Sequence, residues 1–170
     1  MTVSIRRARP EDADFLVELV SHEDVEPYLA AVRAKGREEI LAEIARSDVE
    51  PDAFGVFVVE SNGECAGTMR FERGNARSRI ANLGGLAVHP DFRGAKVADT
   101  AARLFQRHLF DDLGYHRVQM EIYGFNERAM RHAERAGFTR EGVRRRAYWR
   151  NDEWVDGVLY GLLAEELATE

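Results

Sequence analysis

The segment LAVHPDFRGAKVADTAARLFQRHLF, residues 86–110, constrains the fold of this chain most strongly. It begins with apolar residues typical of a strand, turns at Pro90 and Gly94, and continues with apolar residues at helical spacing. A strand that leads through a turn into a helix leaves unpaired backbone N–H groups and a partial positive charge at the start of the helix. Such helix N-termini bind anions. The segment therefore predicts either an anion site or an ordinary strand-to-helix turn.

The other periodicities predict an α/β chain with the order β-α-α-β-β-β-α-β-α-β-β, whose middle strands form antiparallel hairpins. Strands are expected at 3–8, 54–60, 64–72, 81–89, 117–124, 138–149 and 154–163. Helices are expected from Pro10, at 37–46, at 95–112 and at 126–136. Gly114 and Gly137 are typical helix ends, and Asn62-Gly63 and Asn151-Asp152 are typical hairpin turns. Residues 21–36 form a polar lip, and 73–79 a loop.

Composition limits the function classes. The 170 residues suit a single domain, 1–170, and the formal net charge of −6 argues against a general nucleic-acid binder. The single Cys65 forms no internal disulfide, which is compatible with the cytosol, and the five histidines lack metal-ligand spacing. We find no signal peptide and no apolar run of about 20 residues. We expect a cytoplasmic domain with no metal and no membrane or nucleic-acid partner.

Four segments in order point to a family. VHPDFRGAKVA (88–98) and NERAMRHAERAGF (126–138) together resemble the GNAT superfamily of acyl-CoA-dependent N-acetyltransferases. IRRARPEDADF (5–15) resembles the start of that family. REGVRRRAYWRNDEWVDGVLYGLL (140–163) resembles its ribosomal-protein N-terminal and polyamine acetyltransferases. The resemblance implies one GNAT-like domain: a mixed, mostly antiparallel sheet flanked by helices and splayed between strands four and five. It also implies an enzyme that transfers acetyl from acetyl-CoA to a primary amine.

The same resemblance implies where acetyl-CoA binds. In the family, the turn after the fourth strand holds the CoA pyrophosphate with backbone N–H groups. Here that turn comprises Arg93, Gly94, Ala95, Lys96, Val97 and Ala98. The fourth strand would bind the pantetheine arm through its main chain and offer an N–H to the thioester carbonyl, at Leu86, Ala87 and Val88. Asn126 would bind the pantetheine arm or nearby backbone, although Asn is also a favoured helix cap.

Within the motifs at 88–98 and 126–138, two positions depart from the family pattern. Lys96 stands where the family usually has Gly, so its side chain either crowds the N–H groups or adds positive charge for the phosphates. Its alternative interpretation is a solvated residue of the first helical turn. Ala133 stands where many members carry a Tyr that protonates the leaving thiolate. A CoA thiol with a pKa of about 8.5 leaves without a strong acid, so Ala133 does not forbid catalysis.

The catalytic base has no obvious candidate, because Leu83 stands where many relatives have Glu. Glu121, on the polar side of the fifth strand, is the best substitute, acting through water. Its alternative is a solvated carboxylate, and Glu72 and Tyr123 are weaker candidates. The reaction implied is direct attack of an uncharged amine on the thioester. A site poor in bases suits an α-amino group, with a pKa of about 7.7–8.0, better than a lysine amine at about 10.4.

Three questions remain open: whether the domain is catalytic, what the C-terminal arginines do, and which acceptor it uses. The departures at Leu83, Lys96 and Ala133 also fit a non-catalytic acyl-CoA binding or sensing domain. Five arginines near the C-terminus, interleaved with Tyr148 and Trp149, suit RNA stacking, a solvated or dimer-facing surface, or attraction of an acidic substrate or peptide terminus. These are Arg140, Arg144, Arg145, Arg146 and Arg150. The acceptor is a peptide N-terminus, a polyamine or a small amine, and exposed terminal strands would suit a homodimer.

Overall fold

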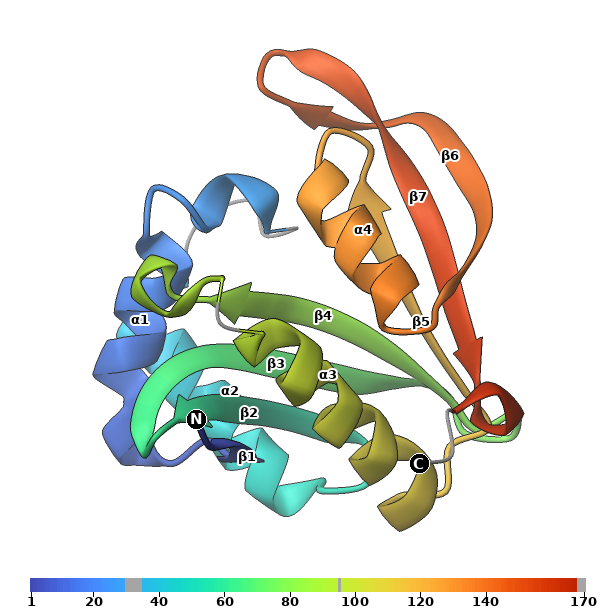
Figure 1. The fold of residues 1–170 in the computed structure, drawn as a ribbon. Helices are drawn as coiled ribbons and strands as arrows, with labels where there is room; N and C mark the ends of the chain where they lie inside the picture. The colour runs from blue at the N-terminus through green and yellow to red at the C-terminus, as the bar shows by residue number, and fades with distance from the viewer. Residues whose placement is uncertain (30–34, 95, 168–170) are drawn as a thin grey trace. The chain divides into compact units, whose positions relative to one another are not determined.

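The structure is a computed structural model that describes residues 1–29, 35–94 and 96–167 (Figure 1). Its strands, in chain order, are β1 (Val3–Arg7), β2 (Phe54–Ser61), β3 (Glu64–Asn75), β4 (Ile80–Val88), β5 (Arg117–Tyr123), β6 (Thr139–Arg150) and β7 (Glu153–Leu163). Its α-helices are α1 (Ala13–Ser21), α2 (Arg37–Val49), α3 (Val97–Arg107) and α4 (Glu127–Arg135). The predicted order of elements is confirmed.

The strands of the described residues form one seven-stranded sheet in the order β1-β2-β3-β4-β5-β7-β6. β1–β2, β2–β3, β5–β7 and β6–β7 pair antiparallel, and β4 pairs parallel with β5. The β4–β5 register joins Ile80–Asn82 to Arg117–Gln119. The expected fold, a mixed and mostly antiparallel sheet flanked by helices, is therefore confirmed.

Some predicted boundaries were wrong. The helix expected at 95–112 begins at Val97 and changes after Arg107 into a π-helical turn, His108–Asp112. The helix expected from Pro10 begins with a 3-10 turn, Pro10–Asp12, and β3 runs to Asn75 into the expected loop. In the lip, a 3-10 turn forms at Glu26–Tyr28, while 30–34 lie outside the described residues.

The chain forms two compact units, and β4 contributes to both. Unit 1 comprises Met1–Arg73 and Leu83–Phe105, and unit 2 comprises Gly74–Asn82 and Gln106–Glu170. Each unit has buried apolar side chains of its own. A single domain spanning 1–170 stays a prediction.

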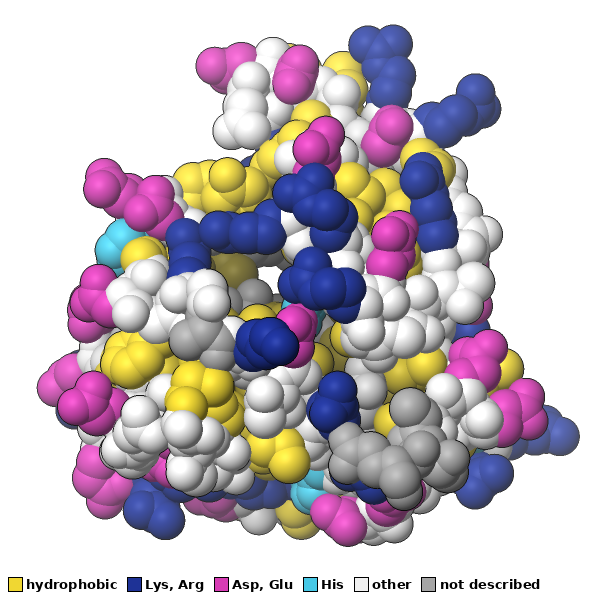
Figure 2. Space-filling view, in the orientation of Figure 1, with side chains coloured by type: hydrophobic (Ala, Val, Ile, Leu, Met, Phe, Trp, Pro, Cys, Tyr) yellow, Lys and Arg dark blue, Asp and Glu magenta, His cyan; other side chains and the backbone are white. Residues whose placement is uncertain are grey.

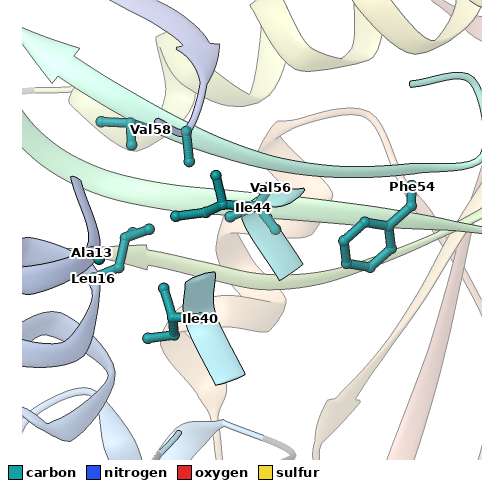
Figure 3. Close-up of a cluster of buried hydrophobic side chains, with 8 residues drawn as sticks. Ala13, Leu16, Ile40, Ile44, Phe54, Val56 and Val58 are labelled. Carbon is teal, nitrogen blue, oxygen red and sulfur yellow. The ribbon is translucent and has the colours of Figure 1, made fainter. Parts of the chain in front are cut away.

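Alternation along β2 gives unit 1 two packed faces. Phe54, Val56 and Val58 pack with the apolar side chains of α1 and α2, including Ile44 (Figure 3). Phe57 points to the other face, where its ring lies 5.0 Å from that of Phe105 in α3, in an edge-to-face arrangement. Successive strand side chains point to opposite faces, so a strand without polar residues from Phe54 to Val59 is covered by helices on both sides.

In unit 2 the sheet residues follow the same rule. Val118 and Ile122 of β5 are buried, as the alternation predicts. Tyr160 of β7 is also buried, and its hydroxyl donates to Glu134 Oε1 of α4 at 3.4 Å. Asn151 and Asp152 both have positive φ, 54° and 59°, so the predicted hairpin turn is of the type that matches the twist of its strands.

A buried ion pair stabilises the start of unit 1. Two guanidinium nitrogens of Arg6 donate to the Asp12 carboxylate at 2.7 and 2.9 Å, and the Arg9 backbone N–H donates to it at 2.7 Å. The Asp12 side chain is only 7% exposed. Burial disfavours the charged carboxylate, but these hydrogen bonds outweigh burial and lower the pKa of Asp12 below its usual value.

We expect Asp12→Asn to lower the free energy of unfolding by about 2 kcal/mol at pH 7, because it leaves the Arg6 guanidinium without its carboxylate. Because the pKa of Asp12 is lower in the folded protein, its ion pair contributes fully to the free energy of unfolding above the unfolded-state pKa of about 3.9. This contribution is lost as pH falls through the pKa of Asp12 in the folded protein. Urea unfolding at pH 7 and pH 3 measures this. A difference between native and variant that persists undiminished at pH 3 would contradict the assignment.

Candidate active site

The turn that joins β4 to α3 lies in unit 1. It contains a 3-10 turn, Pro90–Phe92, and then two residues in the left-handed region, Gly94 at φ +81° and Lys96 at φ +59°. The Thr100 N–H donates to the Lys96 carbonyl at 3.1 Å, so Lys96 immediately precedes the helix. The first backbone N–H groups of a helix have no intrahelical acceptor. The predicted strand-turn-helix is confirmed, whereas Ala95 lies outside the described residues.

Lys96 occupies a backbone conformation that glycine adopts freely. A side chain in the left-handed region costs roughly 1–2 kcal/mol, because its Cβ approaches the following carbonyl. Its side chain is exposed. The turn therefore holds the Lys96 backbone at positive φ, and a lysine at this position carries that conformational cost.

Arg93 braces this turn from its side chain. Its Nε donates to the Val88 carbonyl at 3.2 Å and its Nη2 donates to the Asp24 carbonyl at 3.1 Å. Nearby, His89 Nε2 lies 3.3 Å from Glu18 Oε1. Arg93 therefore joins the turn to the end of β4 and to the segment after α1.

The end of β4 is held closely against β3. The His89 N–H donates to the Ala66 carbonyl at 2.8 Å. A Cβ on Gly67 would lie 2.4 Å from the Ala87 carbonyl oxygen and 3.3 Å from Val88 Cα. Ala87 is buried against Leu19 and Val25, whereas Leu86 is 39% exposed. The β4 segment is thus positioned by backbone contact, which only glycine at position 67 permits.

In unit 2, Asn126 caps α4. Its Oδ1 accepts a hydrogen bond from the Ala129 N–H at 3.2 Å. The capping interpretation is therefore confirmed. Ala133, in the same helix, is fully buried.

Glu121 of β5 has two partners on β6. Its Oε2 accepts from the Tyr148 hydroxyl at 2.6 Å, and its Oε1 lies 3.7 Å from Arg144 Nε. β7 runs between them, and a Cβ on Gly157 would lie 2.2 Å from Glu121 Oε1 and 2.7 Å from the Tyr148 ring. The hydrogen bond to Glu121, with burial, raises the pKa of Tyr148 above its usual value. Tyr148 therefore stays a protonated donor to the carboxylate.

The family of the chain follows from its sequence. The Acetyltransferase (GNAT) domain family matches residues 2–139. The chain belongs to the GNAT family. A relative of this GNAT enzyme is the SPbeta prophage-derived uncharacterized N-acetyltransferase YokL of Bacillus subtilis (strain 168). The two are 28% identical over 127 residues, 74% of this chain and 71% of the relative.

Solved structures share the fold of this GNAT enzyme. The crystal structure of spermidine N-acetyltransferase from Vibrio cholerae in complex with CoA and spermine superposes with a TM-score of 0.86, at 20% identity over 97% of each chain. RimL, a ribosomal L7/L12 α-N-protein acetyltransferase in complex with coenzyme A, gives 0.84 at 17% identity over 96% of this chain and 94% of that one. The predicted fold is thus confirmed, and the family match confirms the predicted enzyme class.

The candidate residues of this GNAT enzyme fall into two groups. Leu86–Val88 and the turn at 93–98 lie in unit 1, whereas Glu121 and Asn126 lie in unit 2. The weaker candidates have other partners. Glu72 pairs with Arg46 at 3.0 Å, and the Tyr123 ring stacks on Phe125 with centroids 5.4 Å apart.

Sequence reasoning missed Tyr148 as the partner of Glu121. The register of β6 against β7 shifts between Arg144 and Tyr148. This shift decides which β6 side chains lie on the same face of the sheet as Glu121 and can reach it across β7. Strand periodicity gives no sign of such a shift. The glycine at position 157, opposite Tyr123 in the β5–β7 register, was the available signal, since glycine inside a strand marks close approach.

Proposed function

We propose that this enzyme transfers the acetyl group of acetyl-CoA to a primary amine by direct attack of the uncharged amine on the thioester. The observation that carries the proposal is the turn before α3, where Gly94 and Lys96 adopt positive φ and lead the chain into the helix N-terminus. Helix N-termini bind phosphate groups through backbone N–H groups and the helix dipole. Membership of the GNAT family supports acetyl-CoA as the anionic substrate.

The roles of the acetyl-CoA residues follow from their backbone. Backbone N–H groups of Gly94, Ala95, Lys96, Val97 and Ala98 would hold the pyrophosphate, while the Arg93 N–H closes the preceding 3-10 turn by donating to the Pro90 carbonyl at 3.2 Å. The main chain of Leu86, Ala87 and Val88 would bind the pantetheine arm, and one N–H there would stabilise the tetrahedral oxyanion, worth roughly 2.7–4 kcal/mol. Asn126 would also contact the pantetheine arm, through the side-chain amide N–H groups that its helix-capping hydrogen bond does not use.

Glu121 is our candidate base. The amine nitrogen forms a bond to the acetyl carbon, the carbon–sulfur bond breaks, and CoA leaves as a thiolate. Glu121, through water, takes the proton that the nitrogen loses. The Glu121 carboxylate accepts a hydrogen bond from Tyr148 and lies 3.7 Å from Arg144 Nε. A carboxylate is by nature a weak base, which suits an amine already partly neutral at pH 7. A peptide α-amino group fits this requirement better than a lysine side chain.

The test of the acetyl-CoA site is calorimetric titration of the native protein and of Lys96→Gly with acetyl-CoA. Because the Lys96 side chain is exposed, we expect both to bind, with affinities within about threefold. Lys96→Gly should remove the cost of the left-handed conformation, which stabilises the folded protein, but glycine also gives the unfolded chain more conformational freedom. The net effect should be to raise the free energy of unfolding by about 0.5 kcal/mol.

Asp152→Gly is the matched control, since Asp152 has the same φ of +59° in the β6–β7 turn. It should gain stability without a change in acetyl-CoA binding. Binding by Lys96→Gly alone would mean that Lys96 blocks the turn, and absence of binding in both proteins would refute the site. CoA release in the presence of peptide amines, followed with a thiol reagent, then tests the transfer itself.

A further inference from the structure

β6 carries a concentration of positive charge that the proposed reaction does not use. Its twelve residues include five arginines and one glutamate, a formal charge of +4, although the whole chain carries −6. Most of these residues are exposed. Figure 2 shows Lys and Arg side chains projecting where Figure 1 places the β6–β7 hairpin. In the strand order of the described residues, β6 is the edge strand of the sheet, next to β7 alone.

The middle of β6 is a bulge. Arg144 pairs with Gly157 and Tyr148 with Val155, so the three residues 145–147 of β6 lie opposite the single residue Asp156. We call the three consecutive arginines at and next to this bulge, Arg144, Arg145 and Arg146, the arginine bulge. Bulges re-aim side chains and are frequent next to active sites.

The bulge is stabilised although its backbone is strained. Arg146 has a φ of +50°, which costs roughly 1–2 kcal/mol for a residue with a side chain. Its backbone N–H donates to Asp156 Oδ1 at 2.7 Å, which holds that conformation. Among the described residues, the side chains of Arg145 and Arg146 have no carboxylate partner. The charge they present is therefore available to a ligand.

The arginine bulge lies beside the candidate base. Arg144 is 3.7 Å from Glu121, and Tyr148, the residue that ends the bulge, donates to the same carboxylate. A polyamine approaching Glu121 would be repelled by the like charge of three arginines. The Glu121 carboxylate would attract it little, because that carboxylate already contacts Tyr148 and Arg144. An acceptor with carboxylates would meet opposite charge, which favours encounter and sets specificity.

We infer that the preferred acceptor is a peptide with acidic side chains downstream of its amino terminus, which dock on the arginine bulge. This inference rests on the proposed function. A short acidic peptide meets only the local charge of β6. A long polyanion such as RNA would also meet the net negative charge of the remaining surface, which opposes its binding.

The test compares three peptides with the same first two residues, followed by four Glu, four Gln or four Lys, and also spermidine. We measure kcat/KM from CoA release at low and high salt. The native enzyme should favour the acidic peptide over the neutral one by about tenfold at low salt, with the preference shrinking as salt screens the charges. Arg145→Gln/Arg146→Gln should reduce the preference to within about twofold.

Arg77→Gln/Arg131→Gln is the matched control. It removes two exposed arginines from the same unit but outside the bulge, and it should keep the preference. Fluorescence anisotropy with labelled acidic peptide and with single-stranded RNA measures docking independently of turnover. We expect the peptide to bind, and the bulge variant to lose that binding.

The outcomes separate the two proposals. CoA release with equal kcat/KM for all peptides, or a preference for spermidine, would overturn the docking inference and leave the proposed transfer standing. Bulge-dependent peptide binding without CoA release from any acceptor would support the docking inference and overturn the transfer. RNA binding tighter than peptide binding, and lost in the bulge variant, would overturn the docking inference in favour of nucleic acid.

Discussion

Gly67→Ala is expected to abolish measurable acetyl-CoA binding and to lower the free energy of unfolding by about 3 kcal/mol. The new Cβ would lie 2.4 Å from the Ala87 carbonyl oxygen. Overpacking of a well-packed interior costs roughly 1–3 kcal/mol, and here the upper end applies because the obstacle is backbone rather than a flexible side chain. Ala87 and Val88 must move, and with them the main chain that we assign to the pantetheine arm.

Urea unfolding and calorimetric titration with acetyl-CoA measure the two effects of Gly67→Ala separately. Gly142→Ala is the control, since it also adds a methyl group to a strand glycine but meets only the Leu159 side chain, at 3.9 Å. It should leave acetyl-CoA binding unchanged. If Gly67→Ala were folded at 20 °C and bound acetyl-CoA like the native protein, the assignment of β4 to the pantetheine arm would be wrong.

Glu121→Gln is expected to lower kcat about 100-fold at pH 7, the lower end of the range for a general base. The amide still accepts the Tyr148 hydrogen bond, so the local structure should persist, but it takes up no proton. The deficit should shrink as pH rises, because hydroxide then increasingly takes the proton that the nitrogen loses.

The pH profile of kcat distinguishes a base from a structural residue, since a misplaced strand would lower the rate by the same factor at every pH. Glu72→Gln removes the same charge from an exposed carboxylate paired with Arg46, and it should keep kcat within about twofold. A native rate in Glu121→Gln would instead indicate that the amine is deprotonated by solvent, and that Glu121 only orders Tyr148 and Arg144.

Local patterns were enough to predict most elements. The apolar run of β2, the alternation in β5, the helical spacing of α2, and the turns at Gly63 and Asn151 were all visible in short windows of sequence. These features depend on near neighbours along the chain, so periodicity and turn chemistry reveal them. Errors lay at element ends, at the π-helical turn after Arg107 and at the extension of β3 to Asn75.

The candidate site was predictable only where it is local. The turn at Gly94 and Lys96 was found because strand, turn and helix follow one another in sequence. That Lys96 adopts positive φ, and that the Arg93 guanidinium binds the carbonyls of Val88 and Asp24, emerged only from the structure. Asp24 is far from Arg93 in the sequence, and no pattern specified their contact.

The sequence by itself determined the order of elements, the position of the strand-turn-helix and the GNAT resemblance. The tertiary structure alone decided that β7 lies between β5 and β6, and that Tyr148 and Arg144 meet the Glu121 carboxylate over Gly157. Strand order and register are set by burying both faces of a sheet at once, through contacts among residues distant in sequence. Periodicity gives the face on which a side chain lies, but it does not identify the partner that the side chain meets there.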